Sequence, residues 1–177
     1  MHAAKALGKL NITAAVETLM AQLKKDASPE VRMEVVKSLS KLLGSPMDEA
    51  IKIALADKEK NVRVVGLDLL NGLQLSQDLK VSLLADVIKT RTVEEKQAAI
   101  TTLGSLPLAN TEKLLSQLLD QLDNGKLPKE VQLELSDAVD SSRSASLISR
   151  YKKISASSSP DSLKAMYASA LMGGDPG

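Results

Sequence analysis

The sequence predicts an all-α fold, in which antiparallel helix pairs stack on one another and a C-terminal helical cap closes the array. Three observations predict it. Aliphatic and helix-favouring residue types dominate the composition, whereas Phe, Trp and Cys are absent. Apolar residues recur at intervals of three and four, as they do on one face of a helix. One segment also recurs along the chain, which is the signature of a repeat architecture.

The recurrent segment is clearest in two copies. "DASPEVRMEVVKSLSKLLG" begins at Asp26, and "DKEKNVRVVGLDLLNGLQL" begins at Asp57, 31 residues later. This alignment also places Arg32 on Arg63. A third copy, "VEEKQAAITTLGSLP", has Lys96 in the arginine position, and a fourth, "PKEVQLELSDAV", has Gln132 there. The repeat therefore weakens toward the C-terminus.

Each copy predicts the second helix of a pair, and the amphipathic segments between the copies predict the first helices. Those segments lie at residues 12–23, 47–55, 79–88 and 114–122. Ser28 and Pro29 mark one helix start, because serine caps a helix and proline is tolerated at its first position. We expect about four pairs over residues 1–142, the first truncated, because "HAAKALGKL" reads as the second helix of a preceding pair.

The C-terminal part of the chain differs in character from the repeats. Residues 143–172 predict capping helices in which Tyr151 and Tyr167 pack, with a serine-rich break at residues 155–159. Residues 173–177 predict a tail or a linker toward a following domain.

Helix pairs of this length, with Asp before the turn and "VR" at the start of the second helix, resemble HEAT repeats. The resemblance implies that Asp26, Arg32, Asp57 and Arg63 form a structural ladder of hydrogen bonds along the turns. Lys96 takes the next arginine position in that ladder.

A narrower resemblance rests on "GKLPKEVQLELSDAVDSS", from Gly125, and on "GGD" at residues 173–175. These segments are similar to the HEAT-repeat region of large planctomycete and verrucomicrobial membrane-bound dehydrogenases and haem-binding proteins. That resemblance implies a spacer between a dehydrogenase-like propeller and a cytochrome c domain, outside the cytoplasm. Any haem c would then lie in the parent protein, and the sequence predicts no cofactor in this segment.

Several classes of chemistry find little basis in the sequence. The charge is balanced, with 23 Lys and Arg against 22 Asp and Glu, so a nucleic-acid partner is not expected. His2 is the only histidine, and there is no cysteine for a thiolate site. The carboxylate pairs Asp48/Glu49 and Glu94/Glu95 fall in predicted first turns, where acidic groups complement the helix dipole. We therefore predict no catalytic, cofactor-binding or metal-ligating residue.

The predicted function is a non-catalytic scaffold that binds a protein or neighbouring domains of the same chain. No apolar run is long enough for membrane insertion, and the sequence carries no address for a compartment. The alternative from another class is a helical-repeat enzyme, such as a DNA glycosylase or a lyase, with its active site in a concave surface. A concentrated basic or carboxylate-lined groove would favour that alternative.

Overall fold

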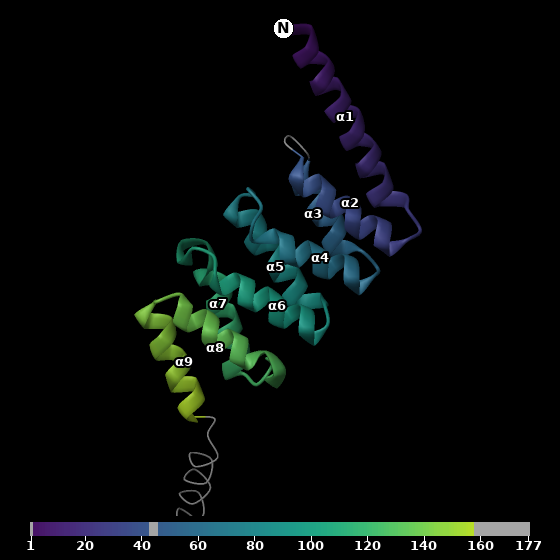
Figure 1. Ribbon diagram of the computed structural model, residues 1–177. Helices are drawn as coiled ribbons and strands as arrows, with labels where there is room; N and C mark the ends of the chain where they lie inside the picture. The colour runs from purple at the N-terminus through teal and green to yellow at the C-terminus, as the bar shows by residue number, and fades with distance from the viewer. Residues whose placement is uncertain (1, 43–45, 158–177) are drawn as a thin grey trace, which may run out of the picture. The chain divides into compact units, whose positions relative to one another are not determined.

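The computed structural model describes residues 2–42 and 46–157, with side chains from residue 14 onward. In this part of the chain all regular structure is helical (Figure 1). The helices are α1 (His2–Lys25), α2 (Pro29–Lys41), α3 (Met47–Ala56), α4 (Lys60–Leu70), α5 (Gln77–Thr90), α6 (Val93–Gly104), α7 (Leu108–Asp123), the 3-10 helix η1 (Lys129–Val131), α8 (Gln132–Ser141) and α9 (Ala145–Ser157). The predicted fold class, an all-α HEAT-like solenoid, is confirmed.

The chain forms two compact units, Met1–Ala99 and Ile100–Gly177. The division falls inside α6. The predicted end of the repeats, after residue 142, falls in the turn that precedes α9 and stays a prediction.

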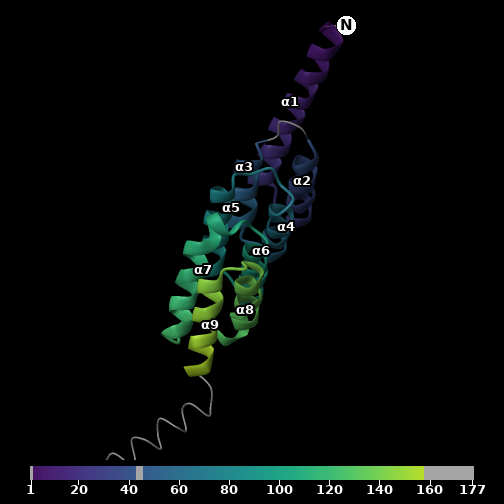
Figure 2. The ribbon, with the colours of Figure 1, turned by 90° about the vertical axis from the view of Figure 1, so that its left-hand side faces the viewer.

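In the first unit, helices of the same kind stack on each other. The first helices α1 and α3 are in contact, and so are the second helices α2 and α4. Each first helix also packs against its own second helix, α1 against α2 and α3 against α4 (Figures 1 and 2). One apolar cluster joins these four helices, and its fully buried members include Val36, Leu39, Ala50, Ala54 and Val62.

Short-range hydrogen bonds set the helix starts. The Ser28 hydroxyl caps α2 by accepting the Val31 amide at 3.3 Å, and Ser76 caps α5 by accepting the Leu79 amide at 3.3 Å. The predicted Ser28 cap is therefore confirmed. Pro29 follows Ser28 at the first helical position. Proline has no amide hydrogen, but an amide at this position would have no partner within the helix, so its absence costs nothing.

The second unit is held together by leucine-rich helix faces. Helix α7 packs against α8 and α9, and α8 packs against α9. Its buried apolar residues include Leu115, Leu118, Leu119, Leu135, Val139, Leu147 and Ile154. Helix α7 ends at Asp123, and Gly125 follows its C-cap with a φ of 66°, the left-handed conformation that glycine adopts without steric cost.

The predictions for the N-terminal segment and for the C-terminal capping helices can each be compared with the structure. The N-terminal segment is one continuous helix, α1. The prediction that "HAAKALGKL" forms a separate helix, the second of a preceding pair, is therefore wrong. Nothing in the segment forces a break, because it has no proline and its one glycine, Gly8, is tolerated within a helix. Helix α9 lies in the predicted capping region and runs through Ser155 to Ser157, where the sequence predicted a serine-rich break. The second capping helix, with Tyr167, and the tail at 173–177 lie outside the described residues.

Candidate functional site

Arg32 lies in the first turn of α2, and only 5% of it is exposed. Its Nη1 donates hydrogen bonds to the carbonyl oxygens of Asp26, at 2.7 Å, and Ala27, at 3.2 Å. These carbonyls belong to the turn between α1 and α2. Arg32 therefore fastens the turn of its own helix pair.

The other edge of the same guanidinium reaches the next helix pair. Arg32 Nε donates to Asp57 Oδ2 at 2.7 Å, and Nη2 donates to Asp57 Oδ1 at 2.9 Å. Parallel hydrogen bonds of this kind are the strongest that arginine makes with a carboxylate. Arg32 thus joins the first pair to the second, and its guanidinium hydrogen bonds are made within the protein.

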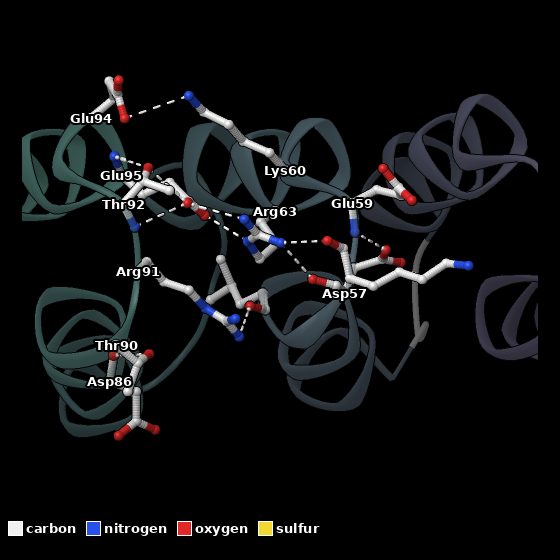
Figure 3. Close-up of polar contacts among 12 residues, drawn as sticks. Asp57, Glu59, Lys60, Arg63, Asp86, Thr90, Arg91, Thr92, Glu94 and Glu95 are labelled. Atoms are coloured by element: carbon white, nitrogen blue, oxygen red, sulfur yellow. Dashed lines mark hydrogen bonds and ion pairs between the residues drawn. The ribbon is translucent and has the colours of Figure 1, made fainter.

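Arg63 repeats this arrangement in the second pair. Its Nη1 donates to the carbonyl oxygens of Asp57, at 2.8 Å, and Lys58, at 2.9 Å. Its Nε donates to Glu95 Oε1 at 2.6 Å and its Nη2 to Glu95 Oε2 at 3.1 Å (Figure 3). The two arginines therefore form consecutive steps of one ladder within the first unit.

The third step of the ladder has Glu95 as its carboxylate. Glu95 meets Arg63 as Asp57 meets Arg32, and Glu95 is only 1% exposed. The same carboxylate accepts the Thr92 amide at 3.3 Å and the Thr92 hydroxyl at 3.0 Å, so it also belongs to the capping box of α6. Lys96 contributes its backbone amide to the carbonyl of Thr92. The spacing from Arg63 to Lys96 is 33 residues rather than 31, which signals that the third turn differs.

Asp26 takes part in the ladder through its backbone. Its carbonyl binds Arg32, whereas its carboxylate Oδ1 accepts the Ser28 amide at 2.9 Å. Asp57 makes the equivalent bond with the Glu59 amide, also at 2.9 Å, and adds the bidentate pair with Arg32. The side-chain pairing thus runs between successive repeats and not within one.

The ladder holds its carboxylates in the ionised form. The hydrogen bonds from Arg63 lower the pKa of Glu95 against the opposing effect of burial. Burial alone would raise the pKa of Asp57, but the hydrogen bonds from Arg32 and from the Glu59 amide outweigh it, and the pKa is lowered. A general acid needs a raised pKa, so neither group has that property.

Two grooves lie at the C-terminal ends of the first helices. The groove between α1 and α3 has a volume of about 490 Å³ and is lined by residues that include Lys25, Ile53 and Lys58. The next groove, between α3 and α5, measures about 90 Å³. Arg91 lines this smaller groove and donates from Nη2 to the Leu55 carbonyl oxygen at 2.9 Å (Figure 3). The larger groove is the candidate site for a partner.

The second unit has a smaller polar site. Arg150 on α9 donates to the Ser116 hydroxyl at 3.0 Å and forms an ion pair with Asp120, both on α7. A groove of about 230 Å³ lies beside it. Tyr151, on the same helix, is half-buried.

Two searches of the described residues concern ions and membranes. No group of three or more His, Cys, Asp or Glu side chains among them is arranged to hold a metal ion. None of the described helices combines the length and the apolar character of a membrane span.

The first unit contains two helix pairs in which arginines 31 residues apart bind their turns in the same way. Residues 1–63 match the family model for HEAT repeats. The matched HEAT segment ends at Arg63 and so covers both arginines of the ladder. No curated protein and no solved structure matches the chain.

Proposed function

We propose that this chain is a non-catalytic HEAT-repeat scaffold that binds a segment of a partner protein. The observation that carries the proposal is the ladder: Arg32, Arg63 and Glu95 are buried and bind neighbouring turns. Their charges stabilise the stack, while the groove between α1 and α3 remains open. Stacked helical repeats offer extended surfaces of this kind to other proteins.

The groove favours a segment that combines acidic and apolar side chains. Lys25 and Lys58 are exposed at its rim, and Ile53 contributes apolar surface. Lys24 is held by Glu49, with Nζ 2.7 Å from Oε1. Acidic and basic residues both line the groove, so it is not the concentrated basic or carboxylate-lined surface that would favour the enzyme alternative.

Selection from a displayed library of random peptides, with the purified 177-residue chain as bait, tests the scaffold function. The selected peptides are then measured against Lys58→Glu in the groove and against Lys129→Glu, an exposed lysine of the second unit. We expect Lys58→Glu to weaken binding severalfold and Lys129→Glu to leave it unchanged. A chain that selects no peptide contradicts the binding of a partner segment in the groove, and a chain that turns over a substrate by itself contradicts the scaffold function. Equal effects of the two variants contradict the choice of groove.

A narrower form of the proposal makes the chain a spacer in a multidomain dehydrogenase that also carries a cytochrome c domain. The support for it is the resemblance of the segments at residues 125–139 and 173–175. The genomic reading frame tests it. A CxxCH motif within about one domain length of Gly177, roughly 100–150 residues, supports the haem connection, and a continuing frame without the motif removes it.

A further inference from the structure

The first helix pair leaves open a surface that the second pair buries. Val62, on α4, is fully buried in the cluster that contains Val35 and Leu39 of α2. Its counterpart one 31-residue period earlier is Val31, which is 37% exposed. Because α4 meets α2 through the side that carries Val62, the equivalent side of α2 faces away from α4.

Asp26 and Asp57, which are also equivalent in the repeat, differ in the same way in their hydrogen bonds. Its Oδ1 accepts the Ser28 amide at 2.9 Å, as Asp57 Oδ1 accepts the Glu59 amide at 2.9 Å. Asp57 also binds the guanidinium of Arg32, which belongs to the preceding pair. Among the described residues, no arginine of a preceding pair binds the Asp26 carboxylate. The turn thus holds the Asp26 carboxylate as the next turn holds that of Asp57, which binds an arginine.

We propose that Asp26 and Val31, together called the α2 end face, dock a helical hairpin of a partner protein. The second helix of that hairpin carries an arginine as its fourth residue, the position that Arg32 has in α2 and Arg63 in α4. The arginine binds Asp26 as Arg32 binds Asp57, and an apolar neighbour covers Val31 as α2 covers Val62. This inference rests on the proposed function, because it names the class of partner. Asp26 also lines the groove between α1 and α3, whereas Val31 does not, so Val31 distinguishes the end face from the groove.

A second copy of the chain fits the α2 end face less well. A symmetric contact between two copies would bring two Asp26 carboxylates into one interface, and like charges facing each other disfavour association. An arginine-bearing hairpin instead continues the interface that α2 already forms with α4.

An extended chain provides the decisive test. A second copy of residues 26–56 is inserted between Lys25 and Asp26, so that both junctions retain sequences of the parent chain. The copied Arg32 then precedes the original Asp26 by 25 residues, which is the separation of Arg32 from Asp57. We expect the extended chain to have a higher denaturation midpoint than the parent. Asp26→Asn at the original position should lower the midpoint clearly in the extended chain and only slightly in the parent.

Binding in trans is measured with a fluorescein-labelled peptide of residues 2–41, the α1–α2 hairpin whose second helix carries Arg32, added to the full 177-residue chain. We expect Asp26→Asn and Val31→Glu each to weaken binding about tenfold or more. Val64→Glu is the matched control, since Val64 is 36% exposed and lies on α4. A peptide with Arg32→Gln should bind as weakly as the parent peptide binds to the Asp26→Asn chain.

The outcomes separate this inference from the proposed function. If the midpoint of the extended chain does not rise, or if it rises equally with Asp26→Asn, the inference is overturned even when the groove binds displayed peptides. A peptide that binds Val31→Glu and Val64→Glu equally also overturns it, as does a dimer of the parent chain that Val31→Glu dissociates. If the end face passes these tests and no displayed peptide is selected, the groove fails and the end face stands.

Discussion

Arg63 and Glu95, 32 residues apart, form a buried bidentate ion pair with Nε–Oε1 and Nη2–Oε2 distances of 2.6 and 3.1 Å. The pair joins the start of α4 to the start of α6 within the first unit. It also completes the capping box of α6. One carboxylate therefore serves both a local helix start and a contact between repeats.

Replacing Glu95 by alanine should lower the free energy of unfolding by about 3–5 kcal/mol, because it leaves the Arg63 guanidinium buried without its charged partner. Urea denaturation followed by circular dichroism measures the change. Glu94→Ala is the control, since Glu94 is in the same turn but is exposed and pairs with Lys60 at the surface, at 3.5 Å. We expect little effect there, and similar losses in the two variants would contradict the structural role of Glu95.

Stability should fall as the solution is acidified. Asp57 and Glu95 have lowered pKa values in the folded chain, so the unfolded chain binds more protons as the pH drops. Their contribution is complete above the unfolded pKa values, about 4, and is lost as the pH falls through the lower folded values. Urea midpoints between neutral pH and about pH 3 measure this slope. Glu95→Gln should make the slope shallower, and an unchanged slope would contradict the linkage.

Gly104→Ala should destabilise the second unit by about 1–3 kcal/mol. A Cβ at Gly104 would lie 2.8 Å from the Ala138 Cα and 3.0 Å from its Cβ, so α6 and α8 would have to separate. Gly72→Ala is the control, because the nearest atom to its added Cβ is the Leu69 carbonyl oxygen at 3.9 Å. Thermal denaturation of both variants checks the difference. A Gly104→Ala chain as stable as the parent would contradict the close contact of α6 with α8 at Gly104 and Ala138.

Ser28→Ala should lower stability by about 0.5–2 kcal/mol, because it removes the side-chain cap of α2. Ser40→Ala, near the other end of the same helix, removes only the bond from its hydroxyl to the Lys37 carbonyl oxygen. We expect that control to lie within about 0.5 kcal/mol of the parent. Chemical denaturation measures both, and equal losses would mean that the hydroxyl of Ser28 has no special role.

The sequence by itself determined the helices and their pairing. Apolar spacing placed the first helices, and the recurrence at Asp26 and Asp57 placed the second ones. These features depend on the helical period and on caps a few residues long. They can therefore be predicted from a single short segment of the sequence. The position of Arg32 in its own turn follows from the same local geometry.

Only the tertiary structure decided which groups meet across repeats. Asp57 instead of Asp26 binds the side chain of Arg32, and Glu95 binds the side chain of Arg63 in the next step. Val31 and Val62 occupy the same place in the repeat, yet one is exposed and the other is buried. Partners and burial depend on what lies on each side of a helix pair, and the stacking that sets this is not written in the pattern of any one repeat.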